Sequence, residues 1–365
     1  MLVSDTVSWL EGLTPWPKEF GLARMERLLA DLGDPQRQYP AIHVVGTNGK
    51  STATRTIAEL LRSEGLRVGA YTSPHVAGWH ERLDCDEAGF ERAVARVRGP
   101  AEELGSTQFE VLTAAAFAEF AARKVDVAVV EAGLGGRHDA TNVLQAPIVV
   151  LTNVALDHVD VLGATRELIA AEKLAVVAPG AAVILGDPEW EELARTNGAS
   201  RVELPGASNL ALAVAAAEAH LGRTVDPHAA DGLEIPGRLE RRGEAPLEIW
   251  DGAHNIAGIG YLLPRLPDRQ RGFTIVASIL VDKNVDAMLR ALTAVGDTLI
   301  ATRSTSARAL PAEELARLAK PYFPSVEAVP DPHQALDRAR LLAGSDGAVL
   351  VTGSLYLLSA LSGHR

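Results

Sequence analysis

The sequence predicts an α/β protein with two domains, each built on a mainly parallel sheet covered by helices. Short apolar runs alternate with segments of helical period along most of the chain. These runs are hydrophobic throughout, as is typical of parallel strands buried on both faces. The alternation stops at 222–237, a stretch with two prolines, and then starts again. A chain of 365 residues also exceeds one usual core, so we expect domains over 1–234 and 235–365.

The first domain has the pattern of a doubly wound sheet, in which strands alternate with helices. Its expected strands are 41–45, 66–71, 125–130, 147–154 and 181–185. Its expected helices are 22–32, a segment beginning at Ala53, 87–98, 110–123 and 208–221. Ligands of such sheets bind outside the carboxyl ends of the strands, so we look for the site there.

The second domain is smaller and has the pattern of a Rossmann-like α/β unit. Its expected strands are 247–250, 272–280, 298–301 and 348–351. Helices are expected between them, at 255–266, 285–295, 311–319 and 333–343.

Composition narrows the class of partner and the compartment. The chain is 47% hydrophobic and 22% charged, with a net charge of −12, which argues against a broad surface for nucleic acid or anionic membrane. A small ligand is therefore expected. The single cysteine, Cys85, and the lack of a signal-like N-terminus indicate a reducing compartment, the cytoplasm. No apolar stretch is long enough to span a bilayer.

The segment 44–52, Val-Val-Gly-Thr-Asn-Gly-Lys-Ser-Thr, is the strongest motif in the chain. It reads as the end of a strand, a glycine corner and the start of a helix. Such a corner presents backbone N–H groups and the positive end of a helix to a polyphosphate, and Lys50 adds an ammonium group. Only two residues separate Gly46 from Gly49, fewer than in the usual phosphate loop. The alternative is a tight strand-to-helix turn without a ligand.

Three polar residues follow other strands of the same sheet. Ser73 follows the strand 66–71, Glu131 follows 125–130, and His158 lies just beyond the strand 147–154. Parallel strands end at one edge, so these side chains are expected near the phosphate loop, where they could hold Mg²⁺. Taken one by one, each also fits a turn or a helix cap.

Two further features are less clear from the residues alone. Lys173 lies in an amphipathic helical segment, 167–174, where a solvated surface lysine is the preferred interpretation. The cluster 251–255, Asp-Gly-Ala-His-Asn, fits either a site in the second domain or an Asx-type helix cap.

Together these motifs resemble the folylpolyglutamate synthase/dihydrofolate synthase family, within the Mur ligase superfamily of ATP-dependent amide-bond ligases. The resemblance extends from about Met25 to Leu358. It rests on the segments 46–50, 71–75, 109–110, 131–137, 139–142, 156–158, 172–173, 236–238, 251–255 and 353–356.

This resemblance implies an N-terminal P-loop ATPase domain of the Mur ligase type over 1–234 and a C-terminal glutamate-ligase domain over 235–365. The implied reaction is ATP-dependent addition of L-glutamate to the carboxylate of a folate, with dihydropteroate as a further acceptor, through an acyl phosphate. The implied cofactors are ATP and Mg²⁺ at two sites, with a carbamate on Lys173 and room for K⁺. A monomer is expected.

The resemblance also assigns residues to roles. Catalysis is assigned to Lys50, His158 and Lys173. ATP binding is assigned to Asn48, Gly49, Lys50, Ser51, Thr52, Asn209, Arg238 and Asp251. Metal binding is assigned to Ser73, Glu131, His158 and the carbamate of Lys173. Residues on the pterin side are Thr107, Gln108, Phe109, Glu110, His138, Asp139 and Ala140. Residues near the incoming glutamate are His254 and Ser354.

The sequence departs from the usual family pattern at three places: Ser51 replaces a glycine, Ile256 replaces a proline, and the region 79–90, which bears on the pterin pocket, is shorter. Two other functions are compatible with the motifs. A Mur ligase acting on a UDP-linked peptide would carry the same phosphate loop. A nucleotide-switch ATPase would also carry it, but would leave Arg238 and the cluster 251–255 unexplained.

Overall fold

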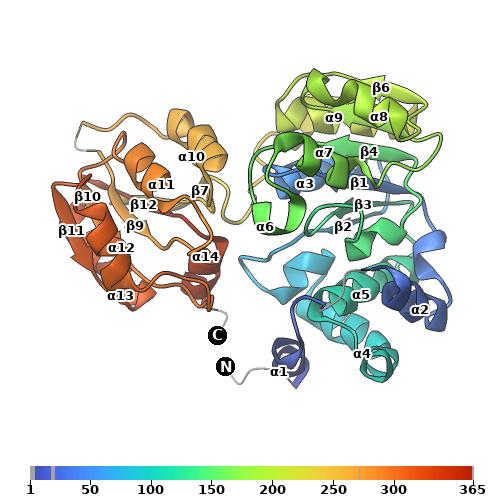
Figure 1. The fold of residues 1–365 in the computed structure, drawn as a ribbon, viewed down its shortest axis with the longest axis horizontal. Coiled ribbons are helices and arrows are strands. Elements are labelled where there is room, and N and C mark those ends of the chain that lie inside the picture. Colours follow the sequence, from blue (N-terminus) through green and yellow to red (C-terminus); the bar gives the residue numbers. More distant parts are fainter. Residues whose placement is uncertain (1–4, 18–20, 271, 364–365) are drawn as a thin grey trace. The chain divides into compact units, whose positions relative to one another are not determined.

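The computed structural model describes residues 5–17, 21–270 and 272–363, and the chain divides into two compact units (Figure 1). Unit 1 comprises Met1–Pro74 and Trp79–Leu233. Unit 2 comprises Glu234–Arg365 together with the short segment His75–Gly78. Within the described ranges, none of the helices is both long enough and apolar enough to cross a lipid bilayer.

Unit 1 is built on a six-stranded parallel sheet in the order β2-β3-β1-β4-β5-β6. Its strands are β1 (Ala41–Val45), β2 (Val68–Tyr71), β3 (Val127–Glu131), β4 (Ile148–Leu151), β5 (Ala182–Leu185) and β6 (Arg201–Glu203). In Figure 1 this sheet runs from β2, next to α5, to β6, next to α8. The parallel α/β class expected for this part of the chain is confirmed.

Helices cover both faces of this sheet because side chains along each strand alternate between the faces. Ile42 and Val44 of β1 face α3 and α9, whereas the neighbouring Val45 joins the core under α7 and α8. On the α7/α8 face, the part near β2 and β3 is covered by α2, α4 and α5. The helices are α1 (Asp5–Gly12), α2 (Ala23–Asp31), α3 (Lys50–Ser63), α4 (Glu87–Leu104), α5 (Gln108–Ala122), α6 (Val159–Leu162), α7 (Arg166–Leu174), α8 (Glu191–Thr196) and α9 (Asn209–Leu221).

Unit 2 is built on a second six-stranded sheet, in the order β11-β10-β9-β12-β8-β7. Its strands are β7 (Glu240–Glu244), β8 (Leu247–Trp250), β9 (Thr274–Ala277), β10 (Thr298–Ala301), β11 (Ser325–Ala328) and β12 (Ala348–Thr352). All pairs are parallel except β7 with β8. The sheet is therefore mixed, with one antiparallel edge.

Two helical layers enclose the second sheet. Its helices are α10 (Ile256–Leu262), α11 (Val285–Leu292), α12 (Ala312–Ala319), α13 (Pro332–Ala343) and α14 (Leu355–Leu361). One face packs against α10, α11 and α12, and the other against α13 and α14. Val76, from the segment His75–Gly78, is buried in the α13/α14 layer, where its side chain approaches Gly237.

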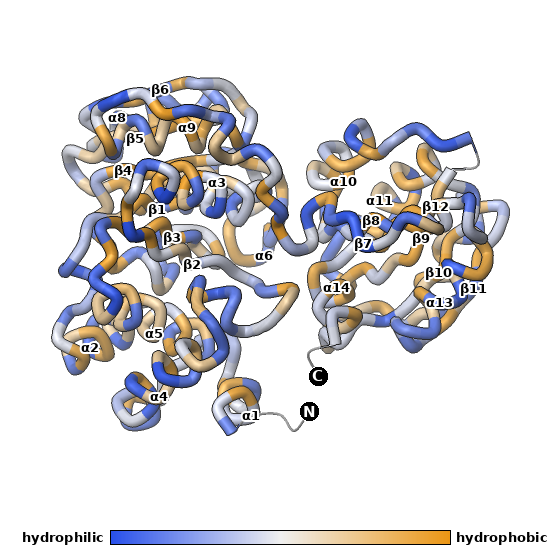
Figure 2. Tube along the Cα trace, turned by 180° about the vertical axis from the view of Figure 1, so that it is seen from behind, coloured by the Kyte–Doolittle hydropathy of each residue, from blue (hydrophilic) through white to orange (hydrophobic). Residues whose placement is uncertain are grey.

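The three strands that were not expected lack a fully buried apolar pattern. Strand β7 has the sequence Glu-Arg-Arg-Gly-Glu and lies at a sheet edge, where Figure 2 shows it as strongly hydrophilic. Strands β6 and β11 are short edge strands that are only partly buried. Helix α3 begins at Lys50 and not at Ala53, because the helix starts directly at the glycine corner. The structure also adds α1 before the first expected helix and α14 after the last expected strand.

Candidate active site

The phosphate loop joins β1 to α3 and is braced by the residues that follow β4. The hydroxyl of Thr152 donates to the carbonyl oxygen of Asn48 at 2.7 Å, and the Asn153 amide donates to the same oxygen at 3.0 Å. The backbone N–H of Asn48 donates to Asn153 Oδ1 at 3.1 Å. This pair, Thr152 and Asn153, was not expected from the sequence. Its only signal was the position of two polar residues at the end of an apolar strand.

Glycine is required at both corners of the loop. Gly46 has a φ of 149°, and a Cβ atom there would overlap the hydroxyl oxygen of Thr152. Gly49 has a φ of 81°, and a Cβ atom there would lie 2.6 Å from Oδ1 of Asn209, the first residue of α9. Asn209 therefore lies directly against the loop. The expected contact of Asn209 with ATP stays a prediction.

The first turn of α3 faces the loop with its N–H groups. The residue before the helix is Gly49, and no side chain in the described part of the chain caps this end. Helix N-termini without a side-chain cap leave backbone N–H groups for an anion. Lys50 begins this helix, and its ammonium group donates to the carbonyl oxygen of Thr47 at 3.4 Å. The corner thus has the donors that a polyphosphate requires.

Glu131 connects the loop helix to the segment after β2. It is the last residue of β3 and is 2% exposed. Ser51 Oγ donates to its Oε1 at 3.0 Å, and the backbone N–H of Ser73 donates to its Oε2 at 3.2 Å. The structure thus brings together Ser51, Ser73 and Glu131 at the edge that was expected. Carboxylate and hydroxyl oxygens of this kind suit Mg²⁺.

His158 follows β4 and precedes α6. It has a left-handed backbone, with a φ of 50°, and its N–H donates to the carboxylate of Asp157 at 2.9 Å. Within the described ranges, no three His, Cys, Asp or Glu side chains lie close enough together to hold a metal ion. The expected set contains only two residues of those types, Glu131 and His158. Metal binding by the expected set therefore stays a prediction.

The position of Lys173 differs from the exposed one that the amphipathic pattern of its helix favoured. It is 4% exposed, and its Nζ donates to the carbonyl oxygen of Gly46 at 2.7 Å. Burial lowers the pKa of Lys173 to about 7, and the charge of Lys50 acts in the same direction. The buried residues of α7 are Ile169, Ala170, Lys173 and Leu174, so the lysine lies on the apolar face. A solvated surface lysine is therefore wrong.

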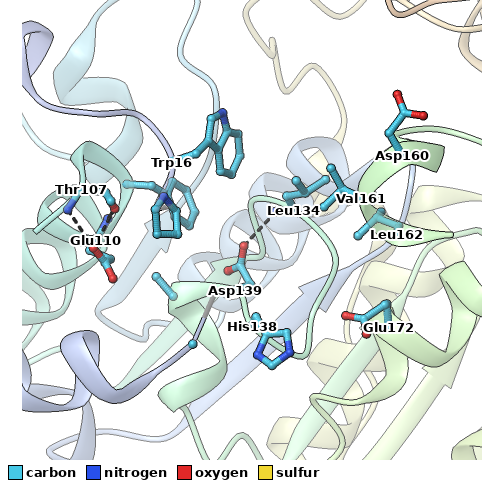
Figure 3. Close-up of a pocket in the computed structure, with 14 residues that line it drawn as sticks. Trp16, Thr107, Glu110, Leu134, His138, Asp139, Asp160, Val161, Leu162 and Glu172 are labelled. Atoms are coloured by element: carbon cyan, nitrogen blue, oxygen red, sulfur yellow. Dashed lines mark hydrogen bonds between the residues drawn. The ribbon is translucent and has the colours of Figure 1, made fainter. Parts of the chain in front are cut away.

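A cavity of about 420 Å³ opens in unit 1 (Figure 3). Its walls include most of the residues expected on the pterin side, namely Thr107, Phe109, Glu110, His138, Asp139 and Ala140. The other lining residues are Trp16, Pro17, Gly21, Leu134, Asp160, Val161, Leu162 and Glu172. Figure 3 shows Thr107 and Glu110 on the side opposite Val161 and Leu162.

Gln108 is the exception among the expected pterin-side residues. It does not line the cavity, and its side-chain amide donates to the carbonyl oxygen of Leu10 at 2.8 Å. Trp16 was missed by sequence reasoning, although its ring stacks on Phe109 with centroids 6.4 Å apart. A contact between residues so distant in sequence leaves no local pattern to detect.

The wall near α5 is held by charged groups. Glu110 accepts from the backbone N–H and the hydroxyl of Thr107, each at 2.8 Å, in a capping box that starts α5. Arg24 of α2 also donates to Glu110, at 2.8 and 3.1 Å. Asp139, another lining residue of the cavity, is buried, and burial raises its pKa although hydrogen bonds from Thr141 and Leu134 act against this.

The candidates in unit 2 surround the turn after β8. Asp251 accepts from the N–H groups of Leu239 and Ala253, each at 2.9 Å, and burial raises its pKa while the charge of Arg238 acts against this. Arg238 donates to the carbonyl oxygen of Gly237 at 2.9 Å. The half-buried Arg238 is thus close enough to the buried Asp251 for its charge to act on the carboxylate.

Three other residues of unit 2 have hydrogen bonds that explain their local conformation. His254 Nδ1 lies 2.9 Å from the carbonyl oxygen of Gly252. Ser354 accepts from the N–H of Tyr356 at 3.2 Å and caps α14. Asn255 caps α10, as the Asx-type interpretation of the cluster 251–255 expects. A role in substrate binding for His254 and Ser354 stays a prediction.

Comparison with known proteins matches both units to domains of Mur ligases. Residues 44–226 match the Mur ligase middle domain, and residues 237–355 match the Mur ligase glutamate ligase domain. A Mycobacterium tuberculosis protein named dihydrofolate synthase/folylpolyglutamate synthase is 35% identical over 84% of this chain and 80% of its own length.

Two solved structures are similar over almost the whole chain. Escherichia coli FolC in complex with DHPP and ADP has a TM-score of 0.86 and 29% identity, covering 98% of this chain and 97% of that one. A bifunctional folylpolyglutamate synthase/dihydrofolate synthase with Mn, AMPPNP and L-glutamate bound has a TM-score of 0.86 and 28% identity, with the same coverage.

Proposed function

The chain belongs to the folylpolyglutamate synthase/dihydrofolate synthase family of Mur ligases, and from this premise we propose how its own residues carry out the family's reaction. It is an ATP-dependent ligase that joins L-glutamate to the carboxylate of a folate. ATP and a divalent metal ion are its cofactors. The acceptors are a folate and, by likeness to the complex with DHPP, dihydropteroate.

A carboxylate is a poor electrophile, so the reaction needs an activated intermediate. An oxygen of the folate carboxylate attacks the γ-phosphorus of ATP, which forms an acyl phosphate and releases ADP. The amine of L-glutamate then attacks the acyl carbon and loses a proton, phosphate leaves, and an amide results. Most of the catalysis in such phosphoryl transfer is positioning and charge stabilisation.

The phosphate loop would bind the phosphates of ATP. The uncapped N–H groups at the start of α3 point to the loop, and Asn48, Gly49, Ser51 and Thr52 belong to the same corner. Lys50 would stabilise the negative charge that shifts during transfer of the γ-phosphoryl group. Asn209, which lies against Gly49, would contact the nucleotide from α9.

The oxygens around Glu131 fit a hard divalent cation. Glu131 supplies a buried carboxylate, and Ser51 and Ser73 adjoin it, so a magnesium ion would be held there with His158 as a further ligand. The bound ion would neutralise charge on the phosphates. Ser51, which replaces the usual glycine of the family, adds a hydroxyl at this position.

Lys173 would be modified by carbon dioxide. Carbamylation requires a neutral amine: its nitrogen attacks the carbon of CO₂, a proton is released, and a carbamate forms. A pKa of about 7 keeps much of the amine neutral at physiological pH. The product would carry the negative charge and oxygen ligands that suit a second magnesium site, whereas an ammonium group would repel the ion.

The cavity would hold the pteridine end of the folate. Phe109 and Trp16 offer aromatic surface for a flat ring, and Asp139 offers a carboxylate for ring N–H groups. Thr107, Glu110, His138 and Ala140 complete this wall.

The remaining assignments rest on the family resemblance. Arg238 and Asp251 would bind ATP, and His254 and Ser354 would bind the incoming glutamate. Unit 1 would act as the ATP-binding domain, and unit 2 as the glutamate-ligase domain. A K⁺ ion, a monomeric state and a cytoplasmic location stay predictions of the same kind.

The observation that carries this proposal is the hydrogen bond from Lys173 to Gly46, which ties a buried amine of low pKa to the phosphate loop. The test is ADP release by the purified protein with ATP and Mg²⁺. We expect stimulation by tetrahydrofolate plus L-glutamate. Stimulation by UDP-muramyl peptide precursors instead, or ATP turnover that ignores both substrates, would contradict the folate assignment.

A further inference from the structure

His43 is a buried polar residue that the reaction described above does not use. It lies in the middle of β1, between β3 and β4, and is fully buried. Its Nε2 lies 2.8 Å from the hydroxyl oxygen of Thr141. In the part of the chain that the structure describes, its Nδ1 has no hydrogen-bond partner. Buried polar groups are nearly always paired, so a half-satisfied histidine in a strand core needs an explanation.

The hydrogen bond of His43 leads to the wall of the cavity. Thr141 is fully buried, and its hydroxyl donates to Asp139 Oδ1 at 2.5 Å. The N–H of Thr141 donates to the same oxygen at 3.0 Å, and the N–H of Leu134 donates to Oδ2 at 2.8 Å (Figure 3). His43, Thr141 and Asp139 thus form a continuous chain of hydrogen bonds from the sheet to the cavity, which we call the His43 relay.

The direction of each bond in the His43 relay follows from the chemistry of its members. An ionised carboxylate only accepts hydrogen bonds, so the hydroxyl of Thr141 donates to Asp139. The hydroxyl oxygen then accepts from His43, which must carry its hydrogen on Nε2 and leave Nδ1 as a bare acceptor. The other tautomer would bury an unpaired N–H donor, and orphaned buried donors are rare.

The His43 relay determines which part of Asp139 remains for a ligand. A carboxylate has about four lone-pair sites, and protein donors occupy three of those of Asp139. Because the hydroxyl of Thr141 cannot turn toward His43, it stays on Oδ1. Counting donors from the described residues, one acceptor position is therefore left, with a fixed direction, on a carboxylate that lines the cavity.

We propose that His43 is a positioning residue that acts through Thr141 to hold Asp139 as an oriented acceptor for an N–H group of the pteridine ring. The inference rests on the proposed function, because it takes the cavity as the pteridine site. His43 itself contacts neither the substrate nor ATP. Loss of its Nε2–H removes the hydrogen bond that fixes the position of the Thr141 oxygen. The Thr141 side chain then holds Asp139 less rigidly, which weakens substrate binding without touching the phosphate loop.

The test compares two substitutions of His43. Leucine keeps the volume but removes the donor, whereas glutamine places an N–H group near the position of Nε2. We expect His43→Leu to raise the KM for the pteridine substrate by about tenfold, with the KM for ATP changed less than twofold. His43→Gln should restore most of the loss. Thr141→Val should raise the same KM, and the His43→Leu/Thr141→Val double variant should be no worse than the worse single variant.

A control separates this role from a general loss of stability. Tyr39 is buried, and its hydroxyl donates to the carbonyl oxygen of Phe117 at 3.1 Å; neither residue is among those that line the cavity. Tyr39→Phe should lower the thermal midpoint yet leave the KM for the pteridine substrate unchanged. An unchanged KM in His43→Leu, or an equal change in Tyr39→Phe, would overturn the proposal.

A second measurement does not depend on catalysis or on the leucine variant folding. The two-bond ¹⁵N–¹H couplings of the His43 ring in ¹⁵N-labelled wild-type protein report its tautomer. These signals are assigned by their disappearance in His43→Gln. We expect the Nε2–H tautomer. The Nδ1–H tautomer would overturn the relay. If the wild-type protein does not ligate glutamate to folate, the proposed function fails. The His43 relay is still tested in that case, because the tautomer decides whether His43 donates its hydrogen bond to Thr141.

Discussion

The side-chain nitrogen of Lys173 lies 2.7 Å from the carbonyl oxygen of Gly46, so the last turn of α7 is tied to the first residue of the phosphate loop. A buried amine at this place is costly unless its charge is lost or matched. Low pKa and nearness to the loop are the two properties that a carbamylated ligand requires. The first two predictions concern this residue.

Lys173→Ala should lose most of the ligase activity, because it removes the group that would carry the carbamate. A short carboxylic acid added to the assay should restore part of it by supplying oxygen ligands, whereas a primary amine should not. The measurement is the rate of folate-dependent ADP release. A direct check is a ¹³C carbamate signal after incubation with labelled bicarbonate, present in the wild type and absent in the variant. Full activity of Lys173→Ala would return the residue to a structural role.

The stability of the protein should rise with pH above neutrality in buffer free of carbon dioxide. Folded Lys173 loses its proton near pH 7, whereas in the unfolded chain it keeps the proton up to about 10.5. Between these values the unfolded state binds more protons, so the free energy of unfolding increases by up to about 1.4 kcal/mol per pH unit. The increase is absent below pH 7 and complete above 10.5. Urea unfolding of the wild type against Lys173→Met measures it, and parallel pH curves would contradict the low pKa.

Gly46→Ala should abolish ATP turnover. Its Cβ atom would overlap the hydroxyl of Thr152, and the φ of 149° is unfavourable for alanine, so the loop must move. Gly65→Ala is the matched control, because Gly65 also has a positive φ, 87°, but no atom of the described chain lies within 4 Å of its added Cβ. The control should lose about 1 kcal/mol of stability and keep its turnover. Similar turnover in both variants would show that loop geometry does not limit catalysis.

Lys50→Ala should lower ATP turnover by at least about 100-fold, since a charge that stabilises transferring phosphate is worth roughly 3 kcal/mol. Thermal stability should change little, because within the described residues the side chain of Lys50 makes one long hydrogen bond, of 3.4 Å, to Thr47. The pKa of Lys173 should rise in this variant, because the charge of Lys50 helps to lower it. Near-normal glutamate ligation by the variant is the result that would remove Lys50 from the mechanism.

The sequence predicted the fold class because its central strands are apolar runs buried on both faces. Strand β1 begins and ends where it was expected, at Ala41 and Val45, and Glu131 closes β3 at the expected edge. Strand β7 could not be predicted in this way. Its charged sequence pairs antiparallel with β8 at a sheet edge, where hydrogen bonding and not apolar burial determines the structure.

The site was predictable where a motif is local and not where it depends on distant contacts. The phosphate loop at 46–52 can be recognised from a few consecutive residues. Thr152 and Trp16, in contrast, lie near the site only once the chain is folded. Lys173 shows a third case. Its spacing from Ile169 places it on the apolar face of α7. Because lysine side chains are usually exposed, the residue type alone favoured a surface position instead.

The last prediction concerns acid stability and His43. Burial lowers the pKa of folded His43 to about 4, against about 6.5 in the unfolded chain. Between these values the unfolded state binds more protons, so stability is fully present above pH 6.5 and is lost as the pH falls toward 4, by up to about 3 kcal/mol. The wild type should therefore lose more stability than His43→Gln across this window, measured by urea unfolding. His228 is the control, because it is exposed and Asp231 raises its pKa, so its contribution is lost as the pH rises and has the opposite sign. If His43→Gln and the wild type lose stability equally between pH 6.5 and 4, the ring is not held neutral in the core, and the Nε2–H tautomer that the relay requires loses its physical basis.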